Sequence, residues 1–141
     1  MTSFESKITH IPAPIDKVYA KLSDLNNLEA VRNMIPADKM AKIKDMRFDT
    51  DSCTVNVDPV GEITFSIIDR EPPKTIKFTA AKSPMPLFLW IQLLPVNEST
   101  TKTRITVKAD INAFLKPMVS KPLQEAVDRM ADVLTVIPYD R

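Results

Sequence analysis

Residues 114–141, FLKPMVSKPLQEAVDRMADVLTVIPYDR, decide the fold that we predict for this chain. Apolar residues recur in this stretch at steps of three and four, which predicts one long amphipathic helix with a single apolar stripe. The stripe consists of Leu115, Val119, Leu123, Val127, Met130, Leu134 and Ile137. Such a helix must cover another apolar surface, and the segments before it alternate as strands do. We therefore expect a curved antiparallel sheet that grips a C-terminal helix.

Two prolines lie near the start of this helix. Pro117 and Pro122 each lack an N–H group, and Pro122 would interrupt the helical hydrogen bonds unless it lay in the first turn. We expect a separate turn over residues 114–119 and a regular helix from about Ser120, whose side chain could cap it. The prolines either start the helix or shape the mouth of a pocket.

The segments before the helix alternate apolar and polar residues with a period of two, which is typical of strands. We expect strands at residues 4–11, 43–49, 52–58, 62–69, 75–82, 87–94 and 103–112. The connections between them are short, so consecutive strands should be antiparallel neighbours. The sheet would then hold about seven strands in a single domain that spans residues 1–141.

Two short helices are predicted between the first and second strands. Pro12 ends the first strand, and Pro14 and Asp16 suit the first turn of a helix. Asp24 can cap a second helix, which Pro36 ends.

The chain has one glycine and twelve prolines, so it has no glycine-rich loop for a phosphate or a dinucleotide. The glycine ends the sequence Asp58-Pro59-Val60-Gly61, which matches a type I turn that closes a hairpin. Residues 71–74 form a second turn.

The composition excludes several classes of function. Nineteen basic and eighteen acidic residues give a net charge of +1 without clusters of like charge, which argues against nucleic acids as partners. The longest apolar stretch, residues 84–94, contains Gln92 and is too short to span a bilayer. No secretory signal is apparent, so we expect a cytoplasmic protein. The single cysteine, Cys53, is expected to be an inert thiol in the core.

The strand at residues 87–94 is apolar on both faces, unlike the other strands. An antiparallel sheet with one face in water should not need the second apolar face. Either loops or the bent sheet cover it, or it meets a hydrophobic ligand or a second subunit in a homodimer.

Residues 8–24, ITHIPAPIDKVYAKLSD, run from a strand through prolines into a helix that ends in Leu-Ser-Asp. This opening resembles that of the SRPBCC or START-like superfamily, which includes polyketide cyclase/dehydrase-like and pollen-allergen-like proteins. The resemblance extends to the order of elements along the whole chain and implies an α+β helix-grip fold. It also implies an apolar cavity between the sheet and the C-terminal helix, often entered near the short helices. Members range from lipid carriers to cyclases, oxygenase subunits and chaperone activators.

The predicted cavity would be lined by apolar residues of the sheet and of the long helix. Our candidates for ligand contacts are Phe65, Phe78, Trp90, Met118, Leu123, Val127, Met130 and Leu134. A closed core would need the same residues, although methionines adapt to varied apolar shapes. The resemblance implies a lipid or a polyketide-like metabolite as the ligand.

Few residues are candidates for catalysis. His10 is the only histidine, so a metal site with paired histidines is excluded, and we expect neither a metal nor a cofactor. Its position in the first strand has the same parity as Phe4 and Ile8, which would turn it inward. We favour a binder of a small hydrophobic molecule over an enzyme. The alternatives are a cyclase or hydratase that uses His10, and a protein-interaction module that uses Phe88, Trp90 and Leu94.

Overall fold

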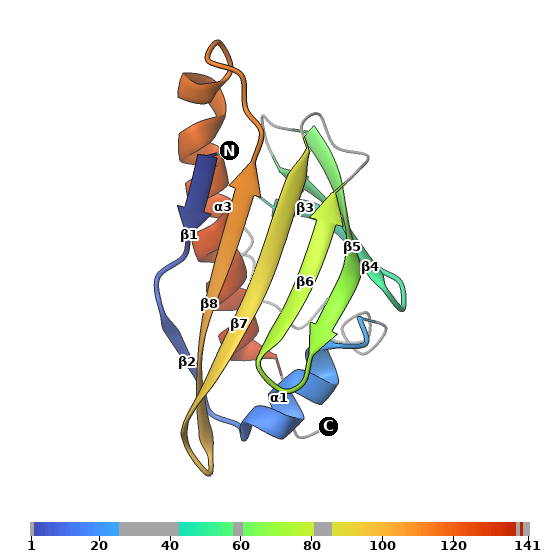
Figure 1. The fold of residues 1–141 in the computed structure, drawn as a ribbon, viewed down its shortest axis with the longest axis vertical. Coiled ribbons are helices and arrows are strands. Elements are labelled where there is room, and N and C mark those ends of the chain that lie inside the picture. Colours follow the sequence, from blue (N-terminus) through green and yellow to red (C-terminus); the bar gives the residue numbers. More distant parts are fainter. Residues whose placement is uncertain (1, 26–42, 58–60, 81–85, 138, 140–141) are drawn as a thin grey trace.

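The computed structural model describes residues 2–25, 43–57, 61–80, 86–137 and 139. One antiparallel sheet curves around the long C-terminal helix α3, which lies behind the sheet in Figure 1. The described helices are α1 (Ile15–Leu22) and α3 (Lys116–Val136). The strands are β1 (Thr2–Glu5), β2 (Thr9–Ile11), β3 (Ile43–Phe48), β4 (Ser52–Val57), β5 (Gly61–Glu71), β6 (Thr75–Ala80), β7 (Leu87–Asn97) and β8 (Thr100–Ala109). The predicted α+β helix-grip fold is confirmed. The second predicted short helix lies outside the described residues.

Consecutive strands from β3 to β8 are neighbours in the sheet, and β8 also pairs with the N-terminal strands β1 and β2. The first residues of the chain therefore form the edge of the sheet next to β8, its last strand. Helix α3 contacts β1, β2 and β8 most extensively, so the two ends of the sequence pack together. The short helix α1 lies at the end of the sheet where β5 turns into β6 (Figure 1).

The predicted hairpin between β4 and β5 is confirmed, because Val57 pairs with Gly61. Gly61 has φ 108°, a conformation that a side chain with a Cβ atom disfavours. The turn itself, residues 58–60, is outside the described part of the chain. The only glycine thus stands where the backbone needs it.

The prediction of one continuous first strand is wrong, and so is the inward orientation of His10. Four residue steps from Glu5 to Thr9 face only three steps from Thr106 to Thr103, so an extra residue separates β1 from β2. An extra residue inverts the parity of the side chains that follow it. The sheet therefore buries Thr9 and exposes His10.

The separate turn predicted at residues 114–119 is also wrong. Helix α3 begins at Lys116 and includes Pro122, while Ser120 lies inside it and donates its hydroxyl to the Lys116 carbonyl at 2.6 Å. Pro122 has no N–H for the carbonyl of Met118, but this first turn is exposed and water can hydrate the carbonyl. Asn112 holds the residues before the helix, because its Oδ1 accepts the Leu115 N–H at 3.0 Å.

Strand β7 turns alternate residues toward α3 and away from it. Its inward residues are Leu87, Leu89, Ile91 and Leu93, all buried. Phe88 and Trp90 lie on the outer face, with ring centroids 6.1 Å apart. The ammonium group of Lys77 lies 5.1 Å from the Phe88 ring and 5.3 Å from the Trp90 ring, while that of Lys108 lies 5.6 Å from Trp90. Lysines of the neighbouring strands thus cover part of the second apolar face by cation–π contacts.

Candidate functional site

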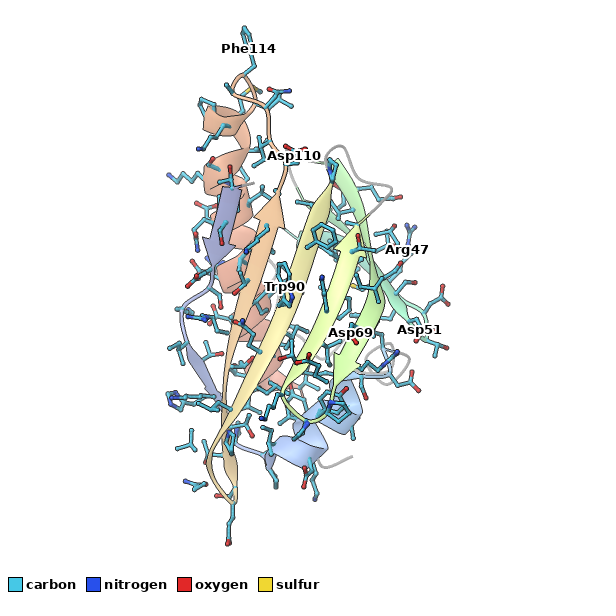
Figure 2. The ribbon with its side chains drawn as sticks, viewed as in Figure 1. Arg47, Asp51, Asp69, Trp90, Asp110 and Phe114 are labelled. Atoms are coloured by element: carbon cyan, nitrogen blue, oxygen red, sulfur yellow. The ribbon has the colours of Figure 1, made fainter. Side chains whose placement is uncertain are left out.

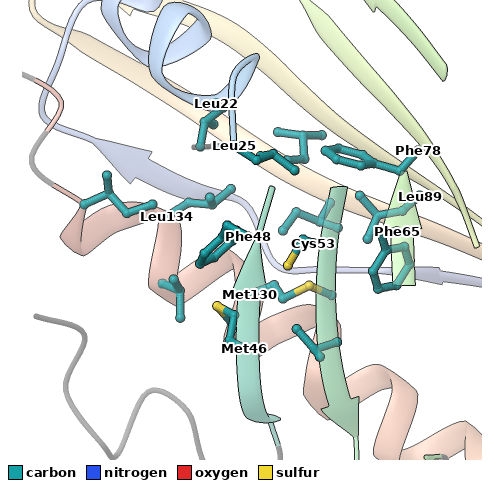
Figure 3. A pocket seen from close by; sticks show the side chains of 15 residues that line it. Leu22, Leu25, Met46, Phe48, Cys53, Phe65, Phe78, Leu89, Met130 and Leu134 are labelled. Atoms are coloured by element: carbon teal, nitrogen blue, oxygen red, sulfur yellow. The ribbon is translucent and has the colours of Figure 1, made fainter. Parts of the chain in front are cut away.

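An apolar cavity of about 90 Å³ lies between the concave face of the sheet, helix α3 and the end of α1 (Figure 3). Fifteen described residues line it, and they come from α1, the residues that follow it, every strand from β3 to β8, α3, and Ile137 just after α3. The resemblance implied a cavity in this place. Its position makes it the candidate functional site.

The antiparallel register places the lining side chains of neighbouring strands in rows. Cys53 pairs with Phe65, Phe78 pairs with Leu89, and Ile91 pairs with Ile105. Paired residues of an antiparallel sheet point to the same face, so each pair contributes two side chains to the cavity wall. The part of the wall that the sheet contributes is therefore built on paired strands.

The chemistry of the described wall is uniform. Every lining side chain is a hydrocarbon, a thioether or the thiol of Cys53, and no carboxylate, amine, amide or hydroxyl is among them. A charged or strongly polar group would lose its hydration here without gaining a hydrogen-bond partner, at a cost of roughly 2–7 kcal/mol for a neutral polar group. The site is thus suited to hydrocarbon and not to ions.

Four of the predicted ligand contacts line this cavity, namely Phe65, Phe78, Met130 and Leu134. Two more, Leu123 and Val127, line a second apolar cavity of about 10 Å³ farther along α3. These six residues also belong to the hydrophobic core or pack against it, as a closed interior would require. That they contact a ligand stays a prediction.

Two predicted contacts do not reach either cavity. Trp90 lies on the outer face of the sheet, toward the viewer in Figure 2, because its neighbours Leu89 and Ile91 occupy the inner face. Met118 is 64% exposed. It precedes Val119 of the apolar stripe by one residue, and successive residues of a helix point about 100° apart. The prediction that these two side chains line the cavity is therefore wrong.

Several lining residues were not predicted from the sequence, among them Leu22, Leu25, Met46 and Phe48. Leu22 follows Val18 by four residues, and this helical spacing of apolar residues was a usable signal for it. Phe48 was harder to assign, because β3 has an extra residue between Lys44 and Arg47 that changes its parity.

A network of hydrogen bonds ties the end of α1 to the turn between β3 and β4, beside the cavity. The Leu25 N–H donates to the Thr50 carbonyl at 3.0 Å. Arg70 of β5 donates to the Ser23 carbonyl at 3.1 and 3.0 Å, and to the Asp51 carboxylate at 2.6 Å. These bonds hold together two segments whose neighbouring side chains, Leu22, Leu25, Phe48 and Cys53, form part of the cavity wall.

Two groups that could transfer a proton, those of His10 and Tyr19, lie outside this wall. His10 is exposed on β2, where its backbone faces Lys102. The Tyr19 hydroxyl is buried without a hydrogen-bond partner among the described residues. Burial raises the pKa of this hydroxyl. The positive charge of Arg70 opposes the shift, and the negative charge of Asp69 adds to it. Among the described residues no group of three His, Cys, Asp or Glu side chains could hold a metal ion, and no helix is long and apolar enough to cross a membrane.

Comparisons with known proteins agree with this architecture. A family model described as polyketide cyclase / dehydrase and lipid transport matches residues 1–135. A START superfamily protein from Mycobacterium smegmatis is similar in structure, with a TM-score of 0.67, 14% identity and 94% of each chain covered. Norcoclaurine synthase from Thalictrum flavum, solved with dopamine and hydroxybenzaldehyde, has a TM-score of 0.68 and 12% identity, covering 95% of this chain and 84% of its own. The comparison with curated proteins found no match. At these identities the similar structures show the fold alone.

Proposed function

The chain belongs to the polyketide cyclase / dehydrase and lipid transport family, and we propose that it binds and carries a small neutral hydrophobic molecule. The observation that carries this proposal is the cavity wall, which offers a ligand apolar contact and no described polar partner. A ligand held in this way gains affinity from the apolar surface that it removes from water. Its polar groups, if any, must remain outside the cavity.

The size of the cavity sets a condition on binding. Burial of one methylene group contributes about 0.8 kcal/mol, and a micromolar Kd needs about 8 kcal/mol. On the order of ten buried carbon atoms are therefore required. The present 90 Å³ is below the ~150 Å³ of an engineered cavity that holds benzene, and well below the ~300–1,000 Å³ typical of ligand pockets. The cavity must widen when it binds, and the flexible side chains of Met46 and Met130 allow it to do so.

The proposal is tested by titrating the purified protein with neutral apolar compounds in a calorimeter. Native mass spectrometry of protein never exposed to detergent provides a second test, because a carried ligand would add to the polypeptide mass. We expect saturable binding with a negative heat-capacity change, which is the signature of apolar burial. A bare polypeptide mass together with no heat of binding at two different temperatures across the compounds tested would contradict the proposal.

A pair of variants on one strand locates the binding. Cys53→Phe fills the cavity from β4, whereas Thr54→Phe places the same ring on the opposite face of that strand. We expect the first variant to lose binding and the second to keep it. Equal loss in both variants would mean that binding occurs elsewhere or that the sheet is disturbed.

The two alternative functions have less support. A cyclase that uses His10 requires this side chain to meet the substrate, but it is exposed and lies outside the cavity wall. A protein-interaction surface around Trp90 would have to displace the lysines that lie over its ring. Pull-down with the Trp90→Ala variant tests the second alternative.

A further inference from the structure

Two apolar cavities follow one another along helix α3, and Met130 lines both of them. The main cavity contacts the helix at Met130, Val133 and Leu134, and the second contacts it at Leu123, Ala126, Val127 and Met130. At 1.5 Å per residue, the helix rises about 17 Å between Leu123, which lines the second cavity, and Leu134, which lines the main one. We propose that Met130 is a movable partition that determines how long an alkyl chain the protein accepts. This inference rests on the proposed function and names the class of ligand.

Three residues line both cavities, namely Val55, Phe65 and Met130. Val55 is β-branched, almost fully buried and held in a paired strand, which fixes its rotamer. Phe65 is buried on the neighbouring strand, opposite Cys53. Met130 is unbranched, only half-buried and carried by the helix. Of the three, it is the side chain that can change rotamer without moving a strand.

The second cavity indicates the shape of the ligand. Its volume is about 10 Å³, and its described wall consists of hydrocarbon side chains and the Met130 thioether. A ring or a branched group would force apart the buried Val55, Ile63 and Phe65, whereas an unbranched chain needs only the space that Met130 vacates. The ligand class is therefore a neutral molecule with one unbranched alkyl chain. The chain runs along α3, from the main cavity toward Leu123.

The test is a chain-length series of primary alcohols, from butanol to tetradecanol, titrated calorimetrically into the wild-type protein and three variants. Each methylene that enters an apolar cavity should tighten Kd about fourfold, and this gain should stop at the chain length that fills the available space. Met130→Ala removes the partition and should extend the gain to longer chains. Met130→Ile is stiff at χ1 and should end the gain at a shorter chain than in the wild type.

Met46→Ala is the matched control, because Met46 lines the main cavity but not the second one. It should strengthen binding of short alcohols without the long-chain extension seen in Met130→Ala. If Met130→Ala does not fold, the shorter limit in Met130→Ile carries the test.

The possible outcomes distinguish a failure of this inference from a failure of the proposed binding function on which it rests. A wild-type protein that binds none of the alcohols overturns both. Binding with the same chain-length limit in the wild type and in the folded Met130 variants overturns the partition and leaves the proposed function standing. An equal extension in Met46→Ala also overturns the partition.

Discussion

Replacing Arg70 by glutamine should accelerate the exchange of ligand much more than it destabilises the protein. Arg70 joins the Ser23 carbonyl to the Asp51 carboxylate and thereby closes the end of α1 against the turn between β3 and β4. The Arg70 and Asp51 side chains are 39% and 64% exposed, so water screens their ion pair. An exposed pair contributes about 0–1 kcal/mol, and a hydrogen bond to a carbonyl about 1 kcal/mol. The whole tie is thus worth about 1–2 kcal/mol.

The loss of about 1–2 kcal/mol affects global unfolding much less than the local separation of α1 from the turn between β3 and β4. The loss is a small part of the free energy of unfolding, which is about 5–15 kcal/mol for a domain. If the ligand passes between these two segments, however, a loss of about 1.4 kcal/mol makes the open state tenfold more populated. Stopped-flow measurements with a fluorescent apolar probe should then show association and dissociation rates that both rise about tenfold, while Kd stays nearly constant.

Arg47→Gln is the matched control for this experiment. It breaks the exposed ion pair between Arg47 and Glu62, whose atoms are 3.2 Å apart, on the outer face of the same sheet. Its effect on stability should be similar or smaller, and its exchange rates should equal those of the wild type. Unchanged exchange rates in Arg70→Gln, in a variant shown by urea unfolding to be destabilised, would refute this route to the cavity.

Three further predictions concern the stability of the fold. Ser6→Ala should lower the free energy of unfolding by about 1–3 kcal/mol in urea titrations, because the buried Ile105 N–H donates to the Ser6 hydroxyl at 2.9 Å and would lose this acceptor; no change would mean that another group takes its place. Gly61→Ala should cost about 1–2 kcal/mol by the same measurement, because φ 108° places a Cβ atom against the backbone; a neutral result would show that the hairpin relaxes freely. Burial raises the pKa of Tyr139 well above its ordinary 10.0, so above about pH 10 the unfolded chain releases this proton while the folded protein keeps it, and stability falls with rising pH. Tyr139→Phe should make that alkaline decline shallower in urea titrations at several pH values, and an identical slope would contradict the assignment.

Periodicity in the sequence was sufficient for the architecture, because a stripe at helical spacing and strands with a period of two each have one way to bury their apolar side. Periodicity did not predict which face of the sheet a side chain occupies where an extra residue interrupts the pairing of two strands. The extra residue between Glu5 and Thr9 that turned His10 outward is visible only against β8, and the one before Phe48 only against β4. No residue type marks either position.

The cavity was predictable in place but not in detail. Leu89 and Trp90 are both apolar, so the sequence alone could not tell which of them faces the helix, and the register with β6 and β8 decides it. Volume depends on sheet curvature and on how side chains meet across the interior, which are properties of the packed structure. The partition by Met130 is a property of this kind, because it involves residues far apart in the sequence.

The position of Trp90 also decides how the protein can be studied in solution. It is the only tryptophan, and its indole lies on the outer face of the sheet beside Lys77 and Lys108. Intrinsic fluorescence should therefore change when the sheet unravels and stay almost constant when a ligand fills the interior. Tryptophan fluorescence therefore reports unfolding specifically. A ligand titration without a fluorescence change does not exclude binding. An optical search for ligands needs an added chromophore, or a tryptophan introduced on the inner face of the sheet.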